Sequence, residues 1–256
     1  MPTLVESSAT LQDRAQQADG TAELSRVEWR LPPLLSVIAG MVDLTGFFTL
    51  GHVFPAHVTG NLVVAAADAV HGGPFHLAQA LAIPVFMLAL AGVWLIAQAS
   101  HRRSVGLVSP LLLVQFLLLA AVLIFSVVTR PSADPHGLMA GVAVMIAVSA
   151  MACQYALLRL AMPRVVSTAV MTGNLTNTVL SLLDSLSERR ALLPVDAGRL
   201  KRSVHLLVGF LLGCVVAAYA VSVFDDWAWA LPVALSGVAL VCFHPVGDAS
   251  QAGSNG

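Results

Sequence analysis

Two copies of a Thr-Gly-Asn tripeptide stand in hydrophobic segments of the chain. Thr59-Gly60-Asn61 lies in AHVTGNLVV and Thr172-Gly173-Asn174 lies in AVMTGNLTN, 113 residues further along a chain of 256. Glycine allows a sharp backbone turn, threonine can cap the next helix, and asparagine in a first helical turn can present its amide to a solute. Polar, glycine-broken segments at matching places in two halves of a membrane protein indicate a substrate path. All six residues are therefore predicted to line a substrate-binding site.

A single acid, Asp43, lies in the middle of the hydrophobic segment SVIAGMVDLTGFF. A charge inside a membrane costs at least ~2.5 kcal/mol on insertion scales and usually faces a cavity or a partner. We predict that Asp43 binds the solute or carries a proton; the alternative is a protonated or hydrogen-bonded acid that fixes helix packing. A loose alignment of the two halves makes Gln154 its equivalent, as a second substrate-binding residue or as an amide that bridges helices.

Two histidines flank the first tripeptide. With Asp43, His52 and His57 could form a proton relay, because histidine changes charge near neutral pH. Their spacing matches no metal-binding signature, and we predict neither a metal site nor another cofactor. The pairs Gly137/Gly141 and Gly209/Gly213 have the GxxxG spacing of close helix contacts.

The composition is that of an integral membrane protein. Hydrophobic residues make up 57% of the chain and charged residues only 11%, and the mean hydropathy is +0.84. Soluble domains carry about 25% charged residues. The expected partner is therefore the lipid bilayer. Nucleic-acid binding is not expected, because no basic patch is interleaved with aromatic residues.

Six runs are long and apolar enough to cross a bilayer, which takes about 20 residues. They are Leu31–Gly51, Leu77–Ala99, Val105–Thr129, Gly137–Leu158, Ser203–Phe224 and Trp227–Phe243. Between them, Thr59–His71 is too short to cross and Val165–Leu183 is polar. We therefore predict an all-α membrane protein with about six transmembrane helices and two short re-entrant or broken helices. One transmembrane domain (residues 29–243) lies between disordered tails, residues 1–28 and 244–256.

The basic residues favour re-entrant segments over two additional crossings. If Thr59–His71 and Val165–Leu183 are both re-entrant, 12 of the 13 Lys and Arg residues lie on the cytoplasmic side. If both segments cross the membrane, only nine lie there. A tilted Val165–Leu183 that spans the membrane stays open as an alternative. Three crossings in each half would invert the second repeat (residues 136–243) relative to the first (residues 31–130). Both termini are then cytoplasmic, in a bacterial cytoplasmic (inner) membrane.

The chain resembles the YoaK family of bacterial multipass membrane proteins over residues 30–243. The resemblance rests on Gly40-Met41-Val42-Asp43, Gly46-Phe47-Phe48-Thr49-Leu50-Gly51, His57-Val58-Thr59-Gly60-Asn61-Leu62, Ala152-Cys153-Gln154-Tyr155-Ala156 and Thr172-Gly173-Asn174-Leu175-Thr176. One position departs from the family pattern, because Tyr155 stands where a small polar residue such as Asn is expected. The resemblance implies an inner-membrane protein of about this length and no particular activity.

The leading hypothesis is a permease or channel for a small solute, with a polar site at the repeat interface. Asn61 and Asn174 would act as ligands, and Asp43 would tune charge or couple transport to protons. A membrane-embedded enzyme using Asp43, His52 and His57 is the alternative, but the chain has no GxSxG or HExxH motif. The third hypothesis is an accessory membrane subunit that transports nothing. The sequence names no solute and allows a homo-oligomer.

Overall fold

The structure is a computed structural model that describes residues 27–70, 77–102, 106–162, 171–186 and 197–243. Its described elements are all helical. They are the N-terminal helix Val27–Thr49, α2 (Gly60–Val70), α3 (Leu77–Arg102), α4 (Val108–Thr129), η1 (Pro131–Ala133), α5 (Leu138–Ala161), α6 (Met171–Leu186), α7 (Ala197–Phe224), η2 (Asp225–Trp229) and α8 (Ala230–Phe243). The predicted tails lie outside the described residues, except that Val27 and Glu28 already belong to the N-terminal helix.

Five helical runs are long and apolar enough to cross a membrane. Four are the N-terminal helix, Leu77–Ala99 in α3, α4 and α5; the fifth, Leu200–Phe243, has 44 residues, about twice the length that one crossing needs. The short 3-10 turn η2 divides it into α7 and α8. These runs confirm the prediction of an all-α multipass membrane protein, and each predicted span coincides with a helix. The 14 residues of α8 reach only about 21 Å.

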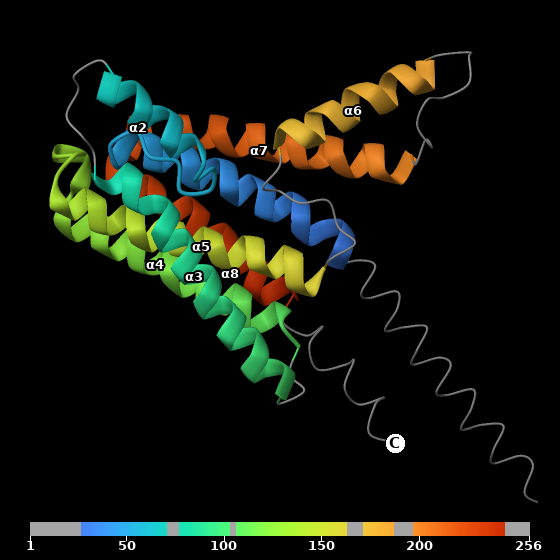
Figure 1. Cartoon of the computed structure of the whole chain (residues 1–256), viewed down its shortest axis with the longest axis horizontal. Helices are drawn as coiled ribbons and strands as arrows, with labels where there is room; N and C mark the ends of the chain where they lie inside the picture. Colours follow the sequence, from blue (N-terminus) through green and yellow to red (C-terminus); the bar gives the residue numbers. More distant parts are fainter. Residues whose placement is uncertain (1–26, 71–76, 103–105, 163–170, 187–196, 244–256) are drawn as a thin grey trace, which may run out of the picture.

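Successive long helices run in opposite directions (Figure 1). The N-terminal helix, α4 and α7 run one way, and α3, α5 and α8 return. The turns η1 and η2 lie together at one end of the bundle, hereafter the η end. The short helix α2 also lies toward the η end, whereas α6 lies beside α7 toward the opposite end.

Polar contacts close the η end. The Asp226 side chain in η2 accepts a hydrogen bond of 2.7 Å from the Ser132 hydroxyl in η1, which ties the two turns together. Burial raises the pKa of the Asp226 carboxyl above its usual range. The buried Trp229 indole donates to the Thr49 hydroxyl at 3.2 Å, joining η2 to the end of the N-terminal helix.

Two helices form the centre of the bundle. In their most hydrophobic stretches, 67% of residues are buried in the N-terminal helix and 72% in α5, against 11% in α3. Large apolar side chains of α3, such as Met87 and Leu88, are therefore exposed, as helices that face lipid require. The two central helices carry Asp43 and Gln154, so both side chains are held in the interior.

The N-terminal helix and α7 cross at very close range. A Cβ on Gly40 would overlap the Phe210 carbonyl oxygen, and one on Gly213 would overlap the Val37 carbonyl oxygen. The Ser36 hydroxyl donates to the Leu206 carbonyl at 2.7 Å across the same interface. This confirms the helix contact predicted for Gly209/Gly213, because small residues let backbones approach.

The prediction is wrong for the other glycine pair. The atoms nearest to a Cβ on Gly137 would be those of Asp134 in its own turn and not those of a neighbouring helix. A Cβ on Gly141 would lie 4.0 Å from the Ala78 Cβ, which is an ordinary van der Waals contact and not a close approach of two backbones.

Small additions at this crossing should destabilise the protein. We expect Gly40→Ala and Gly213→Ala each to lower the thermal unfolding midpoint in detergent, because overpacking costs about 1–3 kcal/mol. Gly92→Ala in α3 is the matched control, since a Cβ there meets nothing within 4 Å. Equal midpoints for all three variants would show that the two helices do not meet as described.

Candidate functional site

The chain between the N-terminal helix and α2 (residues 50–59), hereafter the Pro55 loop, folds back along the N-terminal helix. Its residues Ala56 and His57 lie beside Asp43, six residues before that helix ends at Thr49. The loop thus reaches about 9 Å back from the helix end. Non-helical backbone at such a depth is tolerated only where protein groups satisfy its N–H and C=O groups. The loop therefore needs partners from its surroundings.

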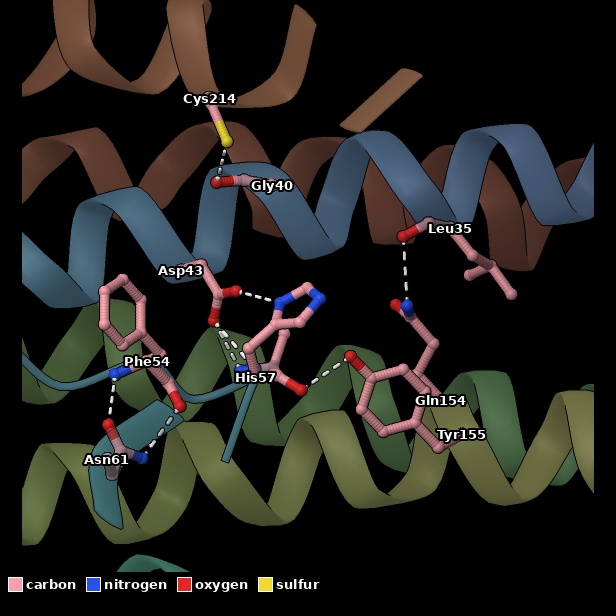
Figure 2. A network of polar contacts seen from close by, with 10 residues as sticks. Leu35, Gly40, Asp43, Phe54, His57, Asn61, Gln154, Tyr155 and Cys214 are labelled. Carbon is pink, nitrogen blue, oxygen red and sulfur yellow. Dashed lines mark hydrogen bonds and ion pairs between the residues drawn. The ribbon is translucent and has the colours of Figure 1, made fainter. Parts of the chain in front are cut away.

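Asp43 supplies the first set of partners (Figure 2). One carboxylate oxygen accepts the amide N–H of Ala56 at 2.6 Å and that of His57 at 3.2 Å. The other oxygen lies 2.5 Å from Nδ1 of the His57 imidazole. The Asp43 side chain is buried. Its carboxylate has three polar partners, all in the same short segment.

Asn61 supplies the second set. Its side-chain oxygen accepts the Phe54 amide N–H at 2.8 Å, and its side-chain nitrogen donates to the Phe54 carbonyl at 3.0 Å. The residue is fully buried at the start of α2. This differs from the expected cavity-facing ligand: both ends of the amide hold the Pro55 loop, because Phe54 lies outside the helices and its backbone groups need side-chain partners.

Tyr155 supplies the third contact. Its hydroxyl donates to the Ala56 carbonyl at 2.6 Å, linking the loop to α5. The tyrosine, where the resemblance implied a small polar residue, thus has a defined contact in this structure. Its neighbour Gln154 accepts from the Gln115 amide at 2.8 Å and donates to the Leu35 carbonyl at 2.9 Å. Gln154 therefore bridges α4, α5 and the N-terminal helix, which is the helix-bridging alternative considered for it.

Two of the three members of the predicted proton relay come together. His57 pairs with Asp43, whereas His52 lies at the η end with a left-handed backbone (φ 59°) and an exposed side chain. The His52 ring packs 4.7 Å from Phe47 and 6.1 Å from His136, centroid to centroid. Within the described helices and loop, no three His, Cys, Asp or Glu side chains gather as a metal site requires.

The second tripeptide lies in a different setting. Thr172 is helical within α6 (Met171–Leu186), and its carbonyl accepts the Thr176 hydroxyl at 2.9 Å. It therefore does not cap the helix as predicted. By contrast, α2 begins at Gly60, with Thr59 in front of it. Asn174 is buried at 3% exposure, and α6 packs against α7. Residues 165–170 of the predicted polar segment lie outside the described residues.

Two cavities border the Pro55 loop, one on each side. The His136 cavity, about 450 Å³, lies toward the η end between the loop and the first turns of α3 and α5, and is lined by Gly51, Val53, Leu81 and His136. The Arg159 cavity, about 570 Å³, lies between the other side of the loop and the later turns of α3 and α5. Its lining includes Ala56, His57, Thr59, Trp94, Tyr155 and Arg159. Phe54 and Pro55 separate the two sets of loop residues.

Several residues of this site were not singled out from the sequence as site residues. Tyr155 contacts the loop and Gln115 contacts Gln154, while Arg159 lines a cavity. A lone amide in an apolar span is a signal that could have marked Gln115. No signal in the sequence pairs Tyr155 with Ala56, because that contact joins positions 99 residues apart.

The comparisons with known proteins give a family. Residues 31–242 match the model of the family described as "Protein of unknown function (DUF1275)". The match covers most of the chain, and the protein belongs to this family. No curated protein and no solved structure matches it significantly.

Removing the Asp43 carboxylate should release the Pro55 loop. We expect Asp43→Ala to speed hydrogen exchange at the Ala56 and His57 amides about tenfold or more, because each lost partner leaves an unpaired group worth about 1–3 kcal/mol. Hydrogen-exchange mass spectrometry of peptides covering residues 50–60 measures this. Asp68→Ala in α2 is the control and should leave these peptides unchanged. Unchanged exchange in Asp43→Ala, with the helices still protected, would show that Asp43 does not hold the loop.

Proposed function

We propose that this protein is a permease or channel for small solutes in the bacterial cytoplasmic membrane. The path follows the interface of α3 and α5 and is interrupted by the Pro55 loop. The observation that carries the proposal is that two cavities end on opposite sides of this loop. Val53 borders the cavity at the η end, and Ala56, three residues later, borders the cavity toward the opposite end.

Charge supports an orientation for this path. Arg159 in the last turn of α5 and Lys201 and Arg202 in the first turns of α7 lie at the end opposite the η end. The η end carries Arg130 together with Asp225 and Asp226. Cytoplasmic loops collect Lys and Arg, so the Arg159 cavity faces the cytoplasm and both termini are cytoplasmic in this proposal.

The proposal includes an inverted repeat. The N-terminal helix crosses α7, and α5 packs against α3, so the first long helix of each half pairs with a later helix of the other half. Asp43 and Gln154 lie in the first long helix of each half, and both are buried. The short helices α2 and α6 lie toward opposite ends. Such arrangements are typical of secondary transporters.

The roles of the predicted site residues follow from their contacts. Thr59 and His57 reach the Arg159 cavity and are the groups that meet a solute. Asp43 acts through His57, as the partner of its imidazole, and Asn61 and Tyr155 position the loop. A solute that binds beside His57 can therefore change the proton balance of the Asp43–His57 pair, which would couple transport to protons.

Solute permeability of liposomes tests the proposal across many solutes at once. Stopped-flow light scattering follows the swelling of proteoliposomes in a panel of small neutral solutes and organic acids. At least one solute should enter faster than into empty liposomes, and Leu160→Trp should return its rate to near the empty value, because Leu160 lines the Arg159 cavity.

The matched control is Leu117→Trp, which adds the same ring at an exposed position of α4 and should leave the rate unchanged. Wild-type rates equal to those of empty liposomes across the panel, or equal effects of both substitutions, would contradict the proposed path.

A further inference from the structure

Most of the lining of the Arg159 cavity is apolar. Apolar side chains of α3 (Ile83, Phe86, Leu90 and Trp94) and α5 (Ala156 and Leu160) form most of the lining. The Phe86 and Tyr155 rings pack against each other within this lining, with their centroids 6.1 Å apart. Such walls suit a planar apolar body, because aromatic rings pack favourably in edge or offset arrangements. The volume of about 570 Å³ lies within the range of small-molecule sites.

Polar groups occupy two separate places on this lining. Arg159 is exposed, and among the described residues no carboxylate lies within ion-pair distance of it. His57 and Thr59 lie on the loop side of the cavity. Figure 2 shows the second ring nitrogen of His57 pointing away from Asp43. Arg159 follows Tyr155 by one helical turn, about 6 Å along α5, and the Tyr155 hydroxyl contacts the loop at Ala56. Arg159 and the loop groups therefore lie in different parts of the lining.

We infer that the Arg159 cavity binds an aromatic monocarboxylate that carries a hydroxyl at its far end. The carboxylate binds the Arg159 guanidinium, the ring lies between Phe86 and the later turns of α5, and the hydroxyl meets His57 or Thr59. This inference rests on the proposed function, for which it names the substrate class. Arginine suits this role because its planar guanidinium donates two hydrogen bonds to one carboxylate.

A membrane phospholipid fits the same cavity less well. A lipid with its phosphate on Arg159 would direct its acyl chains toward the loop, where Thr59 and His57 are polar. Apolar chain ends there would remove these groups from solvent without offering hydrogen bonds, which is unfavourable. A hydroxyl at the far end of the ligand offers such a bond.

Binding of 4-hydroxybenzoate to the full chain in nanodiscs of zwitterionic lipid, measured by isothermal titration calorimetry, tests the inference. We expect saturable binding that Arg159→Gln weakens about tenfold or more and that Arg159→Lys partly restores. Arg30→Gln is the matched control, since Arg30 is exposed at the same end of the bundle and should not matter. The neutral analogue 4-hydroxybenzyl alcohol should bind more weakly than the acid to the wild type, and Arg159→Gln should remove that difference.

Several results would overturn the inference: no saturable binding, equal binding of acid and alcohol, or equal effects of Arg159→Gln and Arg30→Gln. Phosphatidylglycerol in the nanodiscs could also compete with 4-hydroxybenzoate. If it abolished 4-hydroxybenzoate binding to the wild type but did not affect binding to Arg159→Gln, the cavity would be a lipid headgroup site instead. The outcome is separable from that of the permease proposal. Binding without raised liposome permeability would contradict transport alone, and raised permeability without 4-hydroxybenzoate binding would contradict the substrate class alone.

Discussion

The Asp43 carboxylate fixes the position of the Pro55 loop, and the rest of the site depends on it. It accepts the amides of Ala56 and His57 and pairs with the His57 imidazole, two turns inside a hydrophobic helix. Lipid offers no hydrogen bonds, so a loop at this depth must find its partners within the protein. The cost of placing an acid in a membrane is met here by three polar contacts within one short segment.

Three elements hold the same loop from different sides. Asp43 belongs to the N-terminal helix, Asn61 to α2 and Tyr155 to α5. The segment that separates the two cavities is therefore fixed by a few side-chain hydrogen bonds and by the rigid ring of Pro55. Each net hydrogen bond contributes about 0.5–1.5 kcal/mol, so exchange of a few partners is enough to move this segment. In the permease that we propose, such a movement changes the path without separating the surrounding helices.

The sequence predicted the fold class because hydrophobic length alone marks transmembrane helices. It also marked Asp43, since a charged residue in an apolar span needs a partner, and Asn61, through the repeated Thr-Gly-Asn tripeptide. It did not predict what the partners are. Asn61 was expected to face a solute but holds Phe54, because the loop before α2 has unpaired backbone groups that no residue pattern reveals. The Tyr155 contact and the Arg159 cavity depend on how α5 packs against the loop and α3, and periodicity does not encode that packing.

Thiol accessibility at Thr59 tests the central claim most directly, because Thr59 is exposed in the Arg159 cavity although it follows a loop that enters from the η end. In a chain whose three cysteines are replaced, Leu138→Cys marks the η side and Leu160→Cys marks the opposite side. The account predicts that a membrane-impermeant maleimide labels Thr59→Cys from the same side as Leu160→Cys. Labelling from the side that modifies Leu138→Cys would contradict it.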